Sequence, residues 1–503
     1  MSRILFGRTI LVAMLFGCAA EAQGPARSDG PALPTDDAWW KAGQATLADR
    51  LAVAQNRNRA KNVILFIGDG MGISTITATR IFDGQSRGQS GEENILPFER
   101  FSNVALVKTY NTNSQVPDSA GTASAIMTGV KTNIGAINMS SRQKVGTCGD
   151  WRANIVPSLA ERLDALGYAT GVVTTTRLTH ATPATVYAHS PHRNWESDAD
   201  LPEGAKAEGC LDIASQLMDV AHGNGLEVAM GGGRSNFLPE NVADPEYPDR
   251  TGRRKDGRDL TKEWLAGSNR AAYVTSAKDL AALDLAQTDR LLGLFEPSHM
   301  KYEADRAKDA AGEPSLAAMT SVAIDMLSRN DKGYFLMVEG GRIDHAHHDG
   351  NAARALRDGQ AFAEAVAAAL AKVDLSETLI LVTADHSHVF TIAGYPKRGN
   401  PILGVVHGAM DDADHPSHAR DGKPYTTLGY WNGPGAIAGE RPAVDHDEAQ
   451  KLDYRQQAVV PTGSETHGGE DVALFATGAS SWIVGGVLEQ NALYHIMAYA
   501  LGL

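Results

Sequence analysis

Residues 62–70 read Asn-Val-Ile-Leu-Phe-Ile-Gly-Asp-Gly, an apolar, β-branched run that stops at the glycine-flanked Asp69. The same pattern recurs along the chain, with helix-like stretches such as residues 155–166 between the apolar runs. Continuous apolar strands that alternate with helices are typical of a parallel sheet covered on both faces. We therefore predict an α/β fold whose central, mostly parallel sheet is flanked by helices on both faces. The predicted strands are residues 63–67, 170–174, 228–230, 334–338 and 379–383.

Ligands bind to sheets of this kind at the carboxyl ends of the strands. The first residues beyond the predicted strands include Asp69, Glu339, Asp385 and His386. We expect these side chains to meet at one edge of the sheet. Asp69 alone is weak support for a site, because an Asp in a Gly-rich turn also serves as a turn former or helix cap.

The domain organisation follows from length and composition. The 503 residues suggest about three domains by size alone, although one α/β enzyme with insertions can contain them. Residues 390–465 are rich in Gly, Pro, Asp and His, and residues 240–313 are rich in charge, so both are predicted insertions. Residues 37–54 have a helical pattern that would pack on a partner or on its own domain. We assign residues 23–54 to a leader and helix, and residues 55–503 to one catalytic domain.

Residues 1–22 have the features of an export signal. Arg3 and Arg8 precede the apolar run 10–16, and Ala20-Glu21-Ala22 forms a small-residue cleavage pattern. The run is shorter than the roughly 20 residues that span a bilayer, and no other stretch could cross one. Cys18 leaves an alternative, lipid attachment, because residues 15–18 form a loose bacterial lipobox. We predict a periplasmic or secreted protein.

The net charge argues against two classes of partner. The chain has 46 Lys and Arg against 60 Asp and Glu, a balance of −14 with His neutral. Such an acidic chain is a poor candidate for binding nucleic acid backbones or anionic membranes. A phosphate-bearing substrate remains compatible, because bound metal ions reverse the sign of the local field.

Residues 339–348 read Glu-Gly-Gly-Arg-Ile-Asp-His-Ala-His-His and predict metal binding. On a helix, Asp344 and His348 share one face and could hold a single ion. His345 and His347 cannot both point the same way as His348. The alternative is a solvated, His-rich start of a helix.

Further ligands follow the last predicted strand. Residues 385–388 read Asp-His-Ser-His, and one of the two histidines would support a ligand rather than bind the ion. His467 lies in Glu465-Thr466-His467, although a lone His is more often structural. These donors are too many for one ion, since zinc takes about four N, O or S donors and magnesium about six, nearly all oxygen. The sequence therefore predicts several metal ions, as in enzymes of phosphoryl transfer.

Ser119 is the predicted nucleophile. It follows Pro117-Asp118 and precedes small residues, which fits a helix N-terminus where backbone N–H groups favour an anion. The alternative is that Asp118 or Ser119 is only an N-cap. No Ser-His-Asp arrangement is apparent, so a metal ion would have to lower the pKa of Ser119.

Two cysteines remain after Cys18, namely Cys148 and Cys210. In an exported chain they predict one disulfide, with two separate buried thiols as the alternative.

The motifs together resemble those of the alkaline phosphatase family and occur in that family's order. The resemblance covers residues 62–487, includes Tyr187-Ala188-His189 and Arg193-Asn194-Trp195, and is nearer to the animal-type enzymes than to the shorter enteric bacterial type. The motifs that carry it are Gly68-Asp69-Gly70-Met71-Gly72, Pro117-Asp118-Ser119, Glu339-Gly340-Gly341-Arg342-Ile343-Asp344-His345, Thr383-Ala384-Asp385-His386-Ser387-His388 and Glu465-Thr466-His467.

The resemblance implies hydrolysis of small phosphate monoesters through a phosphoserine on Ser119, with two zinc ions and one magnesium ion. It implies that Arg193 grips the phosphate with its planar fork. It implies that the first zinc binds to Asp344, His348 and His467, and that the second binds to Asp69, Asp385 and His386. Magnesium would bind to Glu339 and Thr182, with Asp69 bridging towards the magnesium. Thr182 stands where animal members use Ser, and His180 and His388 would support the ligands.

The resemblance also implies features outside this centre. It suggests a Cys148–Cys210 disulfide, a homodimer, and a crown-like subdomain at 390–465 in the dimer interface. A calcium site would use Glu246, the Phe295 carbonyl, Glu296 and Glu313, although Glu313 stands where the family carries Asp.

Two other functions compete with phosphomonoester hydrolysis. A related phosphodiesterase would generally lack Arg193 and the magnesium ligands, and a sulfatase would need a modifiable Cys or Ser in another motif. A phosphate-binding protein without turnover would have little reason to keep a complete set of ligands.

Overall fold

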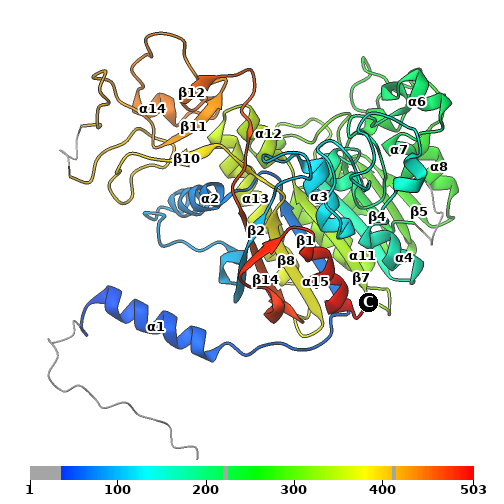
Figure 1. The fold of residues 1–503 in the computed structure, drawn as a ribbon, viewed down its shortest axis with the longest axis horizontal. Helices are drawn as coiled ribbons and strands as arrows, with labels where there is room; N and C mark the ends of the chain where they lie inside the picture. The colour runs from blue at the N-terminus through cyan, green and yellow to red at the C-terminus, as the bar shows by residue number, and fades with distance from the viewer. Residues whose placement is uncertain (1–34, 219–224, 411–414) are drawn as a thin grey trace, which may run out of the picture. The chain divides into compact units, whose positions relative to one another are not determined.

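The computed structural model describes residues 35–218, 225–410 and 415–503 (Figure 1). The predicted signal peptide and Cys18 lie outside the described residues. The chain divides into two units, residues 1–53 and 54–503, which are described separately. No helix in the described ranges is both long and apolar enough to cross a membrane.

The first unit contains helix α1, Ala38–Ala52, within the predicted range 37–54. Asp37 caps it, because its carboxylate accepts hydrogen bonds from the backbone N–H groups of Trp39 and Trp40 at 2.8 and 3.0 Å. None of its residues is buried. Trp39, Leu47 and Leu51 are 60–79% exposed, so this helix offers an apolar surface.

The second unit is built on a ten-stranded sheet, which confirms the predicted fold class. Among the described strands of this sheet, β14 is the one that runs antiparallel to its neighbours, β8 and β2. All seven residues of β1, β7 and β8 are buried, as expected for central strands covered on both faces. The strand order across the sheet is β15 (Val487–Glu489), β2 (Asn103–Lys108), β14 (Val472–Gly478), β8 (Thr378–Ala384), β1 (Asn62–Gly68), β7 (Tyr334–Gly340), β3 (Ala169–Arg177), β4 (Val228–Gly232), β6 (Arg290–Leu294), β5 (Ala271–Val274).

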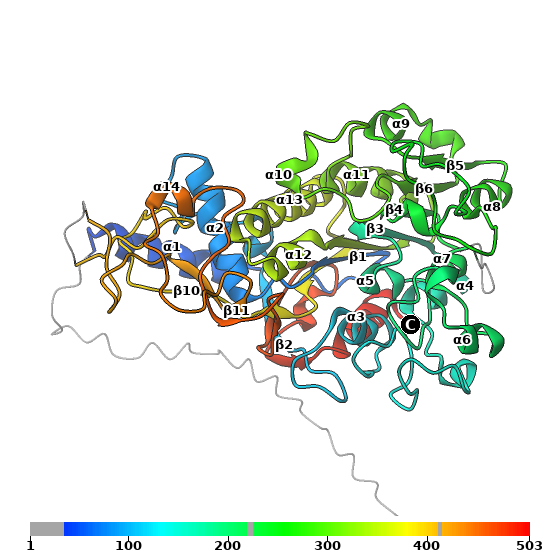
Figure 2. The same ribbon diagram turned by 90° about the horizontal axis from the view of Figure 1, so that it is seen from above.

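Helices cover both faces of this sheet (Figure 2). On one face, α11 (Leu316–Leu327) and α13 (Ala352–Leu370) contact the central strands, and α2 (Ile73–Ser86) packs on α13. On the other, α4 (Leu159–Ala165) and α15 (Ala492–Leu501) contact the strands, and both contact α3 (Ser119–Thr128). One continuous apolar core therefore holds the strand ends that carry the candidate site.

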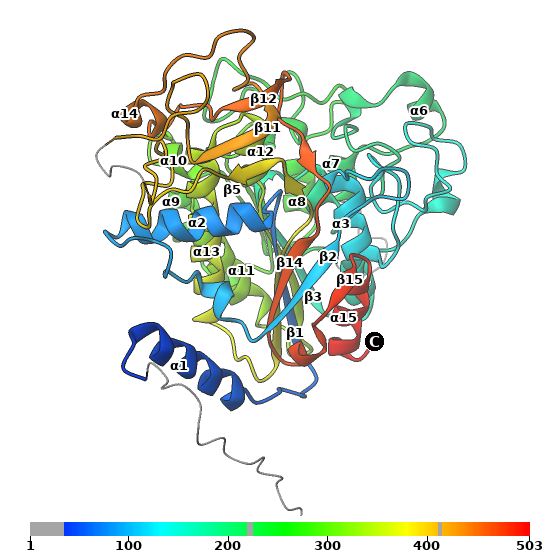
Figure 3. The ribbon, with the colours of Figure 1, turned by 60° about the vertical axis from the view of Figure 1, so that its left-hand side comes forward.

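The two predicted insertions differ from each other. Residues 390–465 contain a separate sheet, β10 (Phe390–Ile392), β11 (Leu428–Gly433) and β12 (Ala458–Pro461), with the short helix α14 (His446–Ala449) (Figure 3). Residues 240–313 do not form a separate subdomain, because β5 and β6 extend the central sheet. Both strands are short and lie at or next to the sheet edge, so their sequence carries no long apolar run to predict them.

Two very short strands pair with each other at the candidate site. Strand β9 (Ser387–His388) pairs antiparallel with β13 (His467–Gly468), and His388 lies directly opposite His467. This pairing joins the two ends of the 390–465 insertion next to α12 (Arg342–His348).

Candidate active site

Three neighbouring strands deliver the acidic side chains predicted to bind metal. Ile67 of β1 pairs with Glu339 of β7, and Gly68 pairs with Ala384 of β8, so Asp69 and Asp385 follow side by side. Asp69, Glu339 and Asp385 are fully buried. Gly70 permits this approach, since it has φ +68° and a Cβ at that position would overlap His388 Nε2.

A first group of donors consists of Asp344, His348 and His467. Asp344 and His348 lie one turn apart on α12, and His348 Nε2 is 3.3 Å from Asp344 Oδ1. Pairing of β13 with β9 brings His467 Nε2 to 3.4 Å from the same oxygen and 3.1 Å from His348 Nε2. His388 Nε2 is 2.9 Å from Asp344 Oδ1, but its Nδ1 faces a second carboxylate, that of Glu465, at 2.5 Å. His388 is thus also within reach of this group, with each of its ring nitrogens facing a carboxylate.

A second group surrounds Ser119. His386 Nε2 is 3.3 Å from Asp69 Oδ1 and 3.4 Å from Asp385 Oδ2. Ser119 Oγ lies 3.0 Å from His386 Nε2 and 3.5 Å from Asp69 Oδ1. In a Ser-His-Asp triad the carboxylate would hold the other ring nitrogen, whereas His386 Nδ1 has no partner among the described residues. The geometry therefore supports a metal ligand at His386 and not a general base.

A third group, rich in oxygen, is formed by Asp69 and Glu339, and Thr182 of the short helix α5 (Ala181–Ala184) lies beside the Glu339 carboxylate. Glu339 Oε2 accepts hydrogen bonds from the hydroxyls of Thr174 and Thr176. A nitrogen of His180 also lies within reach of this group. Asp69 thus belongs to two groups of donors.

These donors fit metal ions, as their unpaired atoms show. Several fully buried polar atoms have no hydrogen-bond partner in the described structure, which is costly unless a ligand completes them. These atoms are Asp69 Oδ2, Glu339 Oε1, Thr182 Oγ1 and His180 Nδ1. Carboxyl oxygens and a hydroxyl suit magnesium, and imidazole nitrogens with carboxylates suit zinc.

The electrostatics of the centre also call for cations. Burial raises the pKa of Asp69 well above its usual value, and the carboxylates of Asp385, Asp344 and Glu339 raise it further. Burial likewise raises the pKa of Asp385, and that of Glu339 to about 7. Burial also acts to raise the pKa of Asp344, but the adjacent histidines hold it well below its usual value. Divalent ions would offset the repulsion among these carboxylates.

Helix α3 orients Ser119. Asp118 is the N-cap, because its Oδ1 accepts a hydrogen bond from the Gly121 backbone N–H at 3.0 Å, and Ser119 is the first helical residue. The sequence left open which residue is the cap, and the structure assigns that role to Asp118. Asp118 Oδ2 also accepts from Arg193 Nη1 at 3.0 Å, while Arg193 Nη2 lies 3.3 Å from His180 Nε2. Arg193 is thereby held next to the N-terminus of α3.

Cys148 and Cys210 form a disulfide across 62 residues, which confirms the predicted pairing. The bond lies in a small apolar cluster with Trp151, Trp195 and Leu201, apart from the main core.

The candidate calcium site differs from the prediction in one residue. The acidic side chains that converge are Glu246, Glu296 and Asp309, and Glu313 is not in this group. The Glu313 carboxylate instead accepts hydrogen bonds from the Lys301 backbone N–H at 3.0 Å. Four acids lie between residues 303 and 313, so the sequence alone does not single out Asp309.

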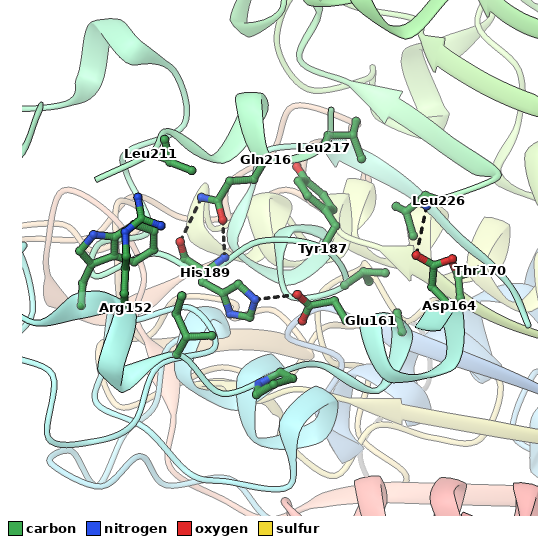
Figure 4. Close-up of a pocket in the computed structure, with 16 residues that line it drawn as sticks. Arg152, Glu161, Asp164, Thr170, Tyr187, His189, Leu211, Gln216, Leu217 and Leu226 are labelled. Carbon is green, nitrogen blue, oxygen red and sulfur yellow. Dashed lines mark hydrogen bonds and ion pairs between the residues drawn. The ribbon is translucent and has the colours of Figure 1, made fainter. Parts of the chain in front are cut away.

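A cavity of about 270 Å³ lies apart from this centre (Figure 4). Its wall includes an ion pair between Glu161 and His189 at 2.8 Å, and Gln216 bonds the backbone of His189. Thr170, near the start of β3, also lines it, whereas none of the candidate metal ligands does. The cavity is not the site of the predicted chemistry.

The chain is similar to known alkaline phosphatases over its whole described length. The family profile described as alkaline phosphatase matches residues 60–503. Over 502 residues the chain is 45% identical to the tissue-nonspecific alkaline phosphatase of Gallus gallus, covering 98% of this chain and 93% of that protein. It is 45% identical over 475 residues to alkaline phosphatase from Gadus morhua, covering 93% and 97% respectively.

Solved structures support the same fold. Thermus thermophilus alkaline phosphatase matches with a TM-score of 0.63 at 26% identity, covering 89% of this chain and 93% of that one. Alkaline phosphatase from the Antarctic bacterium TAB5 matches with a TM-score of 0.59 at 24% identity, covering 88% and 99%, a likeness of fold.

Proposed function

Because the chain belongs to the alkaline phosphatase family and hydrolyses phosphate monoesters, we propose that Ser119 is the nucleophile and forms a phosphoserine intermediate. The observation that carries this proposal is the position of Ser119 Oγ. It lies 3.0 Å from His386 Nε2 and 3.5 Å from Asp69 Oδ1, among donors whose remaining atoms are unpaired.

We assign two zinc ions and one magnesium ion to the three groups of donors. Asp344, His348 and His467 hold the first zinc, and Asp69, Asp385 and His386 the second. Asp69, Glu339 and Thr182 hold magnesium. When bound, these ions supply charge that favours the ionised serine and stabilises the leaving oxygen. His180 and His388 support the ligands by hydrogen bonding.

The protein's own groups bind and orient the phosphoryl group. Arg193 is held by Asp118, and its planar guanidinium would donate hydrogen bonds to two phosphoryl oxygens. The N-terminus of α3 favours negative charge next to Ser119. The Ser119 oxygen bonds to phosphorus as the bond to the substrate's alcohol oxygen breaks, and the alcohol leaves. Water then cleaves the phosphoserine and releases phosphate with Ser119 restored.

Three further assignments complete the proposal. A calcium ion binds Glu246, Glu296 and Asp309, with the Phe295 carbonyl beside them. The protein is exported after loss of residues 1–22, which the disulfide between Cys148 and Cys210 supports, because disulfides persist in oxidising compartments. A homodimer covers apolar side chains of α1 such as Trp39, Leu47 and Leu51.

Replacement of the nucleophile tests the central claim. Ser119→Ala should lose nearly all release of phosphate from an aryl phosphate at alkaline pH, because the variant lacks the hydroxyl proposed to form the intermediate. It should also lose covalent labelling by [32P]phosphate after an acid quench. Ser114→Ala, five residues earlier, is the matched control and should keep both properties. Wild-type turnover or labelling in Ser119→Ala would show that another residue is the nucleophile.

A further inference from the structure

We propose that Glu465 is a positioning residue for the zinc group of Asp344, His348 and His467, and that it acts through His388. Glu465 lies two residues before His467 and is 1% exposed. Its Oε2 is 2.5 Å from His388 Nδ1, and the opposite ring nitrogen of His388 is 2.9 Å from Asp344 Oδ1. The chain of contacts therefore runs from Glu465 through one imidazole ring to a ligand oxygen. This inference rests on the proposed zinc assignment.

A carboxylate is the side chain that this position needs. Glu465 Oε2 accepts from His388, and Oε1 accepts from the Val389 backbone N–H at 2.8 Å. Two N–H donors thus require two acceptors from one buried group. The amide of Gln offers one acceptor and two donors, so it would turn a donor towards one of these N–H groups. Gln at this position would satisfy one contact and lose the other.

The surroundings of Glu465 favour this role over a general structural one. Among the described residues, its ion-pair partners are His388 and His348, and no Lys or Arg pairs with it. A buried carboxylate without such a cation is costly to keep in a folded protein, unless hydrogen bonds compensate it. Here the compensating groups are the Val389 backbone N–H and two histidines of the metal centre, His388 and His348.

The main chain of Glu465 orients a second ligand independently of its side chain. The Glu465 carbonyl accepts from His348 Nδ1 at 2.7 Å, and the Glu465 N–H donates to the His348 carbonyl at 3.0 Å. These bonds leave His348 Nε2 facing Asp344 and His467. Because a substitution leaves the main chain in place, it isolates the contribution made through His388.

Zinc binding to full-length Glu465→Gln is the direct test. Zinc is removed from the purified protein, and its affinity is measured by competition with a chromophoric chelator. Loss of a hydrogen bond behind a metal ligand typically lowers affinity 10- to 100-fold, so we expect about that loss for one zinc ion per chain. Glu465→Asp, which keeps both acceptors on a shorter arm, should recover part of the loss. Glu470→Gln is the control, since Glu470 accepts from Ser387 Oγ at 2.7 Å on the same strand pair without touching a ligand.

A double substitution shows whether His388 transmits the effect. In a His388→Asn background, Glu465→Gln should lower zinc affinity by no more than about 2-fold, because coupled residues are not additive. Additive losses, or zinc affinity within 2-fold of wild type in Glu465→Gln and Glu465→Asp, would overturn the proposal. If wild type itself bound no zinc, the zinc assignment would fail instead.

Discussion

Glu227 is a half-buried carboxyl group just ahead of β4, and it is not one of the candidate metal ligands. Burial raises its pKa to about 7, although its Oε2 accepts a hydrogen bond from the Thr170 backbone N–H at 2.7 Å. In an unfolded chain a Glu has a pKa of about 4.3. Between these values the folded protein holds a proton that the unfolded chain has lost, so the free energy of unfolding falls as pH rises from about 4 to about 7.

Glu227→Gln should therefore stabilise the protein at high pH. At pH 9 we expect the variant to be more stable than wild type by about 1–2 kcal/mol, because it carries no charge to bury. At pH 4.5 the two should be nearly equal. Chemical unfolding at both values measures the difference, and Glu208→Gln, at an exposed position, should change neither. An equal gain at both pH values would contradict the pKa argument.

At the scale of single residues, the sequence identifies candidate metal ligands in regular elements. It does not show which of several neighbouring acids joins a cluster. Asp344 and His348 are predictable because a helical repeat places them one turn apart. Glu339 and Asp385 are predictable because each stands at the end of an apolar run. Asp309 is not, since local spacing does not choose among the acids at 303–313. Glu465 is also missed, because its role depends on a contact across 77 residues with His388.

At the scale of elements, the junction between β7 and α12 sets the position of Glu339. Gly341 is the N-cap of α12. A Cβ at this position would overlap the Thr176 methyl group and come within 3.1 Å of Glu339 Oε1. The glycine therefore allows the helix to begin close behind a side chain assigned to magnesium.

Gly341→Ala should displace Glu339 and loosen the magnesium group. We expect a loss of bound magnesium by metal analysis and a stability loss of about 1–3 kcal/mol, as for overpacking elsewhere. Gly204→Ala in helix α6 (Glu203–Ala207) is the control, because nothing lies within 4 Å of its added Cβ. Full magnesium content in Gly341→Ala would show that the backbone at this junction can move without cost.

The sequence predicts five strands because each is a continuous apolar run, and it predicts the sheet's dominant direction because helices separate them. It does not predict that β14 runs against its neighbours, since a buried run looks the same in either direction. The sequence also does not predict the strands β9 and β13, because two residues are too few to show a periodic pattern. Long-range pairing, rather than local preference, decides these elements.

At the scale of the whole molecule, the metal ions should contribute to folding as well as to catalysis. Asp69, Asp385 and Glu339 all have raised pKa values in the metal-free protein, so the folded state holds protons there. Stability of the metal-free protein should fall as pH rises through these pKa values. Bound ions prevent that fall, and they bind more tightly when their ligands are deprotonated.

Chelation should consequently lower the melting temperature more at pH 9 than at pH 6. Circular dichroism with and without a chelator at both pH values measures this, and re-addition of zinc and magnesium should restore the original values. An equal decrease at both pH values would mean that carboxylate repulsion contributes little to the stability of the metal-free protein.

The position of β14 has a consequence for synthesis. This strand enters the sheet between β8 and β2, and His467, which we assign to the first zinc, lies just before it and opposite His388. A polypeptide still on the ribosome lacks both until residues 467–478 have been translated. A chain that stopped before residue 467 would therefore lack one of the ligands proposed for the first zinc.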